Sequence, residues 1–109
     1  MANTFKLKTK AYVGVTTVGI YTAPASTTTV VIGITMANTS GSGVNVGVGI
    51  TRAGTTEDVK LLKNAPIPQG SSLEFMAGNK IVLEATDTVT VDSDTNNSVD
   101  AALTIMEIT

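Results

Sequence analysis

Hydrophobic and polar residues alternate with a period of two along most of the chain, which is the pattern of half-buried β-strands. The alternation is clearest over residues 44–51, where Val or Ile alternates with Asn, Gly or Thr. Residues 27–37 are rich in β-branched side chains, whose stiff rotamers suit a pleated sheet. Because a turn-forming cluster at 38–43 separates these two segments, we predict that they form a hairpin with a long loop.

Further strands are expected where shorter apolar or β-branched runs occur, at residues 11–15, 18–22, 59–63, 72–75, 80–83, 88–91 and 99–108. The first two form either two short strands or one interrupted strand. Two prolines disfavour a central strand over residues 64–70, which we predict to be an extended crossing loop. A second hairpin turn is predicted at 76–79. One helical turn over 55–62 is the alternative to the strand that we favour there.

Short strands separated by Gly, Pro and Asn turns, with hardly any helical periodicity, are typical of an all-β protein. The sequence therefore predicts an antiparallel β-sandwich of about eight strands. The order of the strands is left open between a jelly-roll-like and an immunoglobulin-like arrangement. The 109 residues suit one domain, which we divide into an extended N-terminal arm, residues 1–10, and the sandwich, residues 11–109.

The composition excludes much of the usual chemistry of enzymes. The chain has no Cys, His or Trp, which removes disulfides, thiolate nucleophiles and the commonest general base and metal ligand. The net charge of −2 argues against a nucleic-acid partner. No apolar run is long enough for a membrane helix, and residues 11–20 are too polar for a secretory signal. We expect no enzymatic activity, no cofactor and neither nucleic acid nor membrane as a partner.

Motif searches give weak signals. No Ser-x-x-Lys spacing occurs, and the two Gly-x-Gly pairs lack the third glycine of a phosphate-binding loop. Residues 92–97 match the opening of a calcium loop, but Leu103 stands where its bidentate Glu is required. A polar turn is favoured there, and no metal site is assigned. The few aromatic residues make a weak glycan platform, so a receptor- or glycan-binding module with loops 38–43 and 92–98 is kept as an alternative.

Charge is distributed unevenly along the chain. Lys6, Lys8 and Lys10 alternate, so in an extended segment all three project to one side. From residue 81 to the end there are six acidic residues and no basic one. Solvated faces explain this most simply. The alternative is that the arm of one copy meets an acidic surface of a neighbour, and the residues predicted for this subunit interface are Lys6, Lys8, Lys10, Asp92, Asp94 and Asp100.

A resemblance covers nearly the whole chain. Its motifs are NTFK (3–6), IYTAPA (20–25), TTVVIGI (28–34), LKNAPIPQGSSL (62–73), KIVLE (80–84), SVDA (98–101) and IMEI (105–108). In this order they are similar to small virion structural proteins of tailed bacteriophages, especially contractile-tailed phages of marine bacteria.

The resemblance implies a non-enzymatic, multi-copy component of the virion, synthesised in the host cytoplasm. Its partners would be identical copies and other capsid or tail proteins. Within that class we favour a capsid decoration (cement) protein, and the alternative is a neck, tail or baseplate structural protein.

Overall fold

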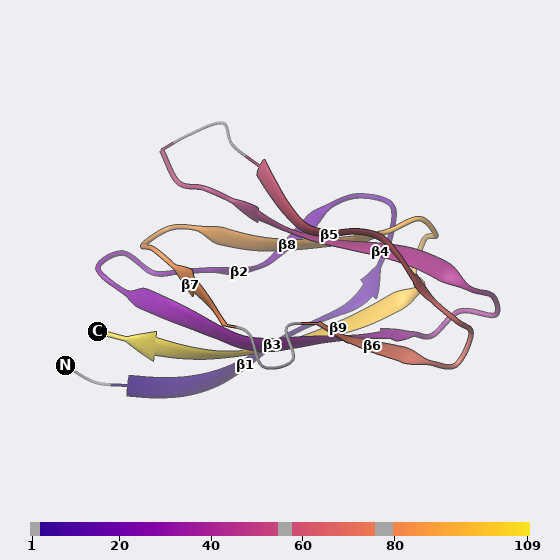
Figure 1. Ribbon diagram of the computed structural model, residues 1–109, viewed down its shortest axis with the longest axis horizontal. Helices are drawn as coiled ribbons and strands as arrows, with labels where there is room; N and C mark the ends of the chain where they lie inside the picture. The colour runs from indigo at the N-terminus through magenta and orange to yellow at the C-terminus, as the bar shows by residue number, and fades with distance from the viewer. Residues whose placement is uncertain (1–2, 55–57, 76–79) are drawn as a thin grey trace.

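Nine strands in two antiparallel sheets make up the protein, in a computed structural model that describes residues 3–54, 58–75 and 80–109. None of these described residues is helical. The strands are β1 (Asn3–Val13), β2 (Val18–Thr22), β3 (Thr28–Asn38), β4 (Val44–Thr51), β5 (Asp58–Ile67), β6 (Ser72–Phe75), β7 (Ile81–Leu83), β8 (Thr88–Ser93) and β9 (Val99–Ile108). Figure 1 shows the sheets as two facing layers, with both termini at the same end.

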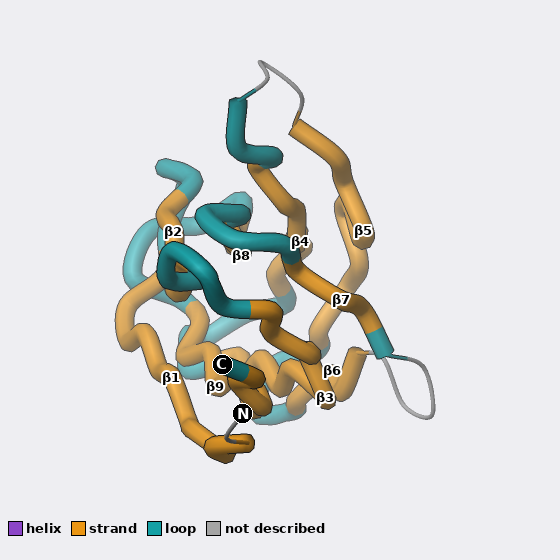
Figure 2. Tube along the Cα trace, turned by 90° about the vertical axis from the view of Figure 1, so that its left-hand side faces the viewer, coloured by secondary structure: helices purple, strands orange, loops and turns teal. Residues whose placement is uncertain are grey.

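The chain crosses repeatedly between the two sheets, so most strands that are consecutive in sequence lie in different sheets. Sheet A has the order β1-β9-β3-β6, and β7 also pairs with β3. The short strands β7 and β6 lie one after the other along the same edge of β3, opposite residues 29–31 and 34–37 respectively. Sheet B has the order β2-β8-β4-β5. The end-on view in Figure 2 shows β4, β5 and β8 stacked over β1, β9 and β3.

The order of pairing identifies the fold as a jelly roll. Strand β1 pairs with β9, β2 with β8, β3 with β7 and β6, and β4 with β5, so the first half of the chain runs antiparallel to the second. The pairs β3–β9 and β4–β8 then roll this long double strand into a sandwich. The predicted all-β antiparallel sandwich is confirmed. Since β6 and β7 share one position, it has eight strand positions, as expected.

The predicted hairpin over residues 27–51 is wrong, although both of its strands are present. Strand β3 lies in sheet A and β4 in sheet B, and the five residues between them cross the sandwich. Such a loop is long enough to span the roughly 10 Å between packed sheets. The buried Asn38 fixes the crossing, because its amide donates to the carbonyl oxygens of Ser42 (2.7 Å) and Ile67 (3.0 Å).

Two other predictions about pairing and loops also need correction. Strands β6 and β7 pair with β3 rather than with each other, and the predicted turn at 76–79 lies outside the described residues. The predicted crossing loop at 64–70 is in its first half a strand, because β5 continues to Ile67. Pro66 is tolerated there because β5 is an edge strand, where a missing N–H breaks no ladder. The helical alternative is wrong for residues 58–62, which lie in β5, and residues 55–57 lie outside the described part.

The N-terminal segment is part of the sheet. Residues 3–10 are extended, as predicted for an arm, but they pair with β9 from Asn3 opposite Ile108 to Lys10 opposite Ala101. Strand β1 continues through the expected boundary at residue 11 and breaks register after Lys10, before Val13 pairs with Val99. Tyr12 lies in this bulge with φ of 60°. A role for residues 1–10 in contacting a neighbouring subunit stays a prediction.

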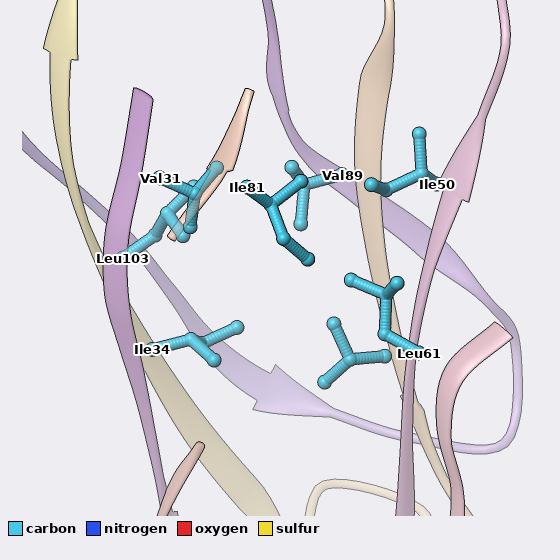
Figure 3. Close-up of a pocket in the computed structure, with 8 residues that line it drawn as sticks. Val31, Ile34, Ile50, Leu61, Ile81, Val89 and Leu103 are labelled. Atoms are coloured by element: carbon cyan, nitrogen blue, oxygen red, sulfur yellow. The ribbon is translucent and has the colours of Figure 1, made fainter. Parts of the chain in front are cut away.

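The core lies between the two sheets and is filled by aliphatic side chains. Figure 3 shows Val31, Ile34 and Leu103 of sheet A pointing toward Ile50 and Val89 of sheet B. The gap that remains among them has a volume of about 10 Å³, which is too small for anything larger than one water molecule. The interior therefore serves packing and holds no ligand cavity at this place. Among the described residues there is no helix of the length and apolar character needed to cross a membrane.

Candidate functional site

The three predicted lysines lie on one side of β1, as expected from their spacing. Lys6, Lys8 and Lys10 stand opposite Ile105, Leu103 and Ala101, which are all buried in the core. Residues directly opposite each other in an antiparallel pair share a face of the sheet. The lysines therefore project to the inner side of sheet A, at its free edge.

One of these lysines anchors β1 to a buried polar cluster. Lys6 Nζ lies 2.9 Å from Oε1 of Glu107, whose side chain is largely buried. The Tyr21 hydroxyl donates to Glu107 Oε2 at 2.6 Å and lies 2.8 Å from the Thr29 hydroxyl. The hydrogen bond from Tyr21, with that from Lys6, holds the pKa of Glu107 below its usual range. Burial and the bond to Glu107 raise the pKa of Tyr21 to about 12.

The three predicted acidic residues do not form one surface. Asp92 stands opposite Gly47 on the outer face of sheet B, where it accepts a hydrogen bond from Thr17 and lies 3.8 Å from Lys60 Nζ. Asp94 lies in the turn between β8 and β9, and Asp100 stands on the opposite, outer face of sheet A. Lys6 is paired within its own chain. The interface predicted from these charges stays a prediction, and the folded chain does not gather its acidic half.

The turn considered for calcium is held by the protein's own donors. Asp94 Oδ1 accepts from the backbone N–H of Asn45 at 3.1 Å and from the Thr95 hydroxyl. The Ser98 hydroxyl donates to the carbonyl oxygen of Thr95 at 2.6 Å, and Asn97 adopts a φ of 52°. This is the self-bonded polar turn that the sequence favours. Within residues 3–54, 58–75 and 80–109, no three Asp, Glu, His or Cys side chains gather as metal ligands.

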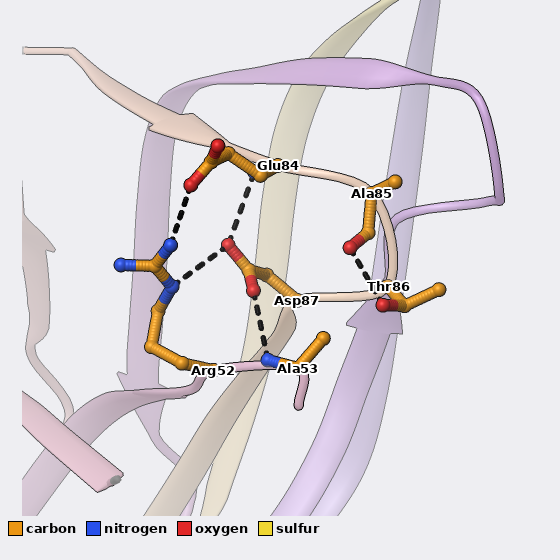
Figure 4. A network of polar contacts seen from close by, with 6 residues as sticks. All are labelled: Arg52, Ala53, Glu84, Ala85, Thr86 and Asp87. Carbon is orange, nitrogen blue, oxygen red and sulfur yellow. Dashed lines mark hydrogen bonds and ion pairs between the residues drawn. The ribbon is translucent and has the colours of Figure 1, made fainter. Parts of the chain in front are cut away.

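A second polar cluster fixes the loops at one end of the sandwich (Figure 4). The buried carboxylate of Asp87 accepts the backbone N–H groups of Ala53 and Glu84, both at 3.0 Å, and Arg52 Nε lies 3.1 Å away. Arg52 also pairs with the exposed Glu84. Burial raises the pKa of Asp87, but the two N–H donors and Arg52 outweigh it, so the pKa is lowered. The ionised carboxylate of Asp87 thus has its partners inside the chain, as expected for a group that stabilises the loops around it.

The outer face of sheet A is the surface that lacks an explanation within one subunit. The register aligns Phe5 with Met106, Met106 with Val30 and Val30 with Val82, so one apolar row crosses all four strand positions. Phe5 is 69% exposed and Val82 60% exposed. Leu7, also on this face of β1, is 63% exposed. Exposed apolar groups in one continuous patch indicate a contact surface.

The outer face of sheet B has the opposite character. Its central residues are Thr and Gly, with charged groups beside them, and they bond to one another. The hydroxyls of Thr22 and Thr88 lie 2.9 Å apart, and the Thr51 hydroxyl donates to Asp58 at 2.9 Å. An antiparallel sheet exposed to water normally has such a polar outer side. Only sheet B, of the two, is built for solvent in this way, so the outer face of sheet A is the candidate functional site.

This face is not uniform along the strands. Its apolar row lies at the end where Phe5 stands. At the other end, Ala and Thr side chains together with Lys10 and Asp100 surround a shallow depression of about 340 Å³. Asp100 closes the depression, with Oδ1 accepting the backbone N–H of Tyr12 at 3.1 Å. The residues that line it are Thr9, Lys10, Ala11, Thr35, Ala37, Asp100, Ala101 and Ala102.

Sequence reasoning missed this face, although the signal was present. Residues 28–36 and 99–108 carry apolar side chains at both odd and even positions, whereas a strand with one wet face alternates. Apolar residues on both sides of a strand indicate that both sides are covered. Phe5 and Leu7 alternate with Lys6 and Lys8, so β1 has the pattern of an ordinary strand with one polar face and does not indicate that its outer side is covered.

Comparison with known proteins agrees with the fold. No family model matches the chain, and no curated protein matches its sequence. The structure is similar to a chain of the Helicobacter pylori bacteriophage KHP30 capsid, with a TM-score of 0.58 and 10% identity over 100% of this chain and 94% of that chain. It is also similar to a chain of Bacillus endospore appendages, which are disulfide-linked pili, with a TM-score of 0.57 and 17% identity over 99% and 87%. At these identities the likeness shows a shared fold.

Proposed function

We propose that the protein is a structural component of a tailed-bacteriophage virion, present in many copies, and that it is a capsid decoration (cement) protein. The observation that carries the proposal is the difference between the two outer faces of the jelly roll. One is polar and hydrogen-bonded within itself, and the other exposes an apolar row headed by Phe5 and Val82. A domain of this kind works by being covered on one side by neighbours.

Three further features support a structural role. The sequence resembles small virion proteins of tailed phages over nearly its whole length, and the fold is similar to a phage capsid chain over the full chain. The polar clusters around Glu107 and Asp87 are satisfied by partners inside the chain, as expected for groups that stabilise the fold. The interior between the sheets is filled with side chains rather than shaped around a ligand.

Decoration is favoured within the virion because of size and charge. A single small domain with a net charge of −2 and a polar sheet B suits a position facing solvent on the outside of a shell. Many copies, each making modest contacts, strengthen a shell through multivalency.

The proposal is tested by electron microscopy of the intact particle and by binding of the purified protein to expanded capsids that lack it. Density for this jelly roll at many sites on the outer capsid surface, with saturable binding, is the expected result. Density in the neck, tail or baseplate would overturn the decoration role and keep the structural one. Absence from the particle, with binding to cells or glycans, would overturn the virion role altogether.

A further inference from the structure

The two ends of the outer face of sheet A differ in side-chain size in a way that makes the face complementary to itself. At one end, Phe5 and Met106 are the two large side chains of a row that continues through Val30 and Val82. Four residues further along β1, the corresponding row is Thr9, Ala102, Thr35 and Glu74. Thr9 and Ala102 are its small side chains, and with Thr35 they border the depression. We propose that a second copy of this chain covers this face, with the large row of each copy over the small row of the other.

The register of the sheet allows this arrangement to be worked out. Consider a two-fold axis that lies in the interface and runs across the strands at the level of Leu7. This axis places each strand over the same strand of the second copy, running in the opposite direction. Phe5 is then over the second copy's Thr9, and Met106 over the second copy's Ala102, because both pairs are equally far from the axis. The same contact occurs twice, as in an isologous interface. Two sheets packed face to face with aligned strands are a common arrangement.

The size of the face suits a stable pair. A two-fold axis at Leu7 overlays residues 3–11 of β1, which is nine residues, and sheet A is four strand positions wide. At about 3.4 Å per residue and about 4.8 Å between strands, the overlapping face measures about 31 by 19 Å, or about 590 Å² on each copy. Two such faces bury about 1,200 Å² in total, at the lower end of the range of about 1,200–2,000 Å² that specific interfaces bury.

The lysines on the free edge of sheet A disfavour contact between two copies at that edge, and this favours contact at the outer face. Pairing of β1 with β1 of a second copy, edge to edge, would place Lys6, Lys8 and Lys10 of one copy against the same lysines of the other. Like charges directly opposite each other in a sheet are destabilising, and edge lysines commonly prevent such pairing. The outer face of β1 carries Phe5, Leu7 and Thr9 instead, which have no charge to repel a second copy.

This inference deepens the proposed multi-copy role and rests on it for its setting, but its test needs no virion. Analytical ultracentrifugation of the purified chain measures the dimer dissociation constant for the wild type and for the variants Phe5→Lys and Thr9→Glu. Both positions are exposed in the single subunit, so the fold should persist, which circular dichroism checks. The matched control is Val15→Ser, a residue 56% exposed in the turn after β1 and off this face.

The expected result is a wild-type dimer whose dissociation constant rises about 30-fold or more in each face variant and stays within about threefold in the control. Mixing the two face variants should restore a heterodimer. One of its two contacts pairs the introduced ammonium with the introduced carboxylate, and the other is native. This rescue requires Phe5 of one copy to lie near Thr9 of the other.

A monomeric wild type at millimolar concentration would overturn the inference, as would a dimer that neither face variant weakens. A monomer whose binding to expanded capsids is lost in Phe5→Lys would show that another virion protein covers the face. That outcome would refute the second copy and leave the proposed function standing. A dimer that never binds the particle would support the second copy and refute the proposed function.

Discussion

Removing the charge of Glu107 tests whether the cluster at the open edge of the sandwich holds β1 in place. In Glu107→Gln the side chain keeps its shape and one oxygen acceptor, but it loses the ion pair with Lys6 and the charge-assisted bond from Tyr21. Hydrogen bonds to charged groups contribute about 1.5–3 kcal/mol. The part-exposed ion pair contributes at most about 1 kcal/mol. Since one neutral hydrogen bond remains, the expected loss in the free energy of unfolding is about 2 kcal/mol.

The assay is thermal unfolding followed by circular dichroism at pH 7. For a domain of this size a loss of about 2 kcal/mol lowers the melting temperature by roughly 8 °C. The matched control is Glu84→Gln, because Glu84 also belongs to an ion pair but its side chain is exposed. Exposed pairs contribute little, so the control should change the melting temperature by no more than about 2 °C.

The pH dependence gives a sharper test of the same cluster. Because the pKa of Glu107 is lowered in the fold, its charge stabilises the protein above the ordinary carboxyl pKa, and this stability is lost as the pH falls through the lowered value. The difference between wild type and Glu107→Gln should therefore shrink toward zero at acidic pH. Asp87 also loses stability in acid, but it does so in both proteins and cancels. An equal difference at pH 3 and pH 7 would refute this account.

Three further predictions, made with four substitutions, concern separate parts of the fold and are checked by thermal unfolding. Asp87→Asn should cost about 2 kcal/mol or more, because two backbone N–H groups and an arginine lose their shared carboxylate. Gly49→Ala should lower the free energy of unfolding by about 1–3 kcal/mol, because the added Cβ would lie 2.9 Å from a carbonyl oxygen of β5. Its control is Gly33→Ala, where the added Cβ meets open space and the free energy of unfolding should change by no more than about 0.5 kcal/mol. Tyr12→Asn should stabilise the chain by about 0.5–1 kcal/mol, because Tyr12 is 72% exposed and its φ of 60° suits Asn better. A destabilised Tyr12→Asn variant would contradict this view of the bulge.

Local patterns in the sequence predicted the strands well and their partners poorly. The alternation over residues 44–51 correctly places Val46 and Val48 in the core, because a period of two depends only on the strand itself. Which sheet a strand joins depends on the contacts that the preceding loop makes with residues distant in sequence. Asn38 determines that crossing by bonding Ile67, 29 residues away, and turn composition carries no trace of this contact.

The candidate site was hidden for a related reason. Phe5, Val30, Val82 and Met106 come from four separate segments and meet in one row only through the register of β1, β9, β3 and β7. The three predicted lysines were visible because they lie on one strand. Residues on one strand can be grouped from spacing, whereas a surface that crosses a sheet requires the strand order, which the sequence left open.

Strands β3 and β9 contribute side chains to both faces of sheet A. Both strands carry apolar side chains on both sides at the end where Val30 and Met106 lie, which is typical of strands covered on both faces. Their inner residues, such as Val31 and Ile105, complete the sandwich, while Val30 and Met106 remain partly open on the other side. Sheet A thus completes the core of its own subunit and, in the proposed pairing, contacts a second copy through its outer face. The polar outer face of sheet B and the lysines on the β1 edge disfavour association at those two places, so we expect the pairing to occur at the outer face of sheet A.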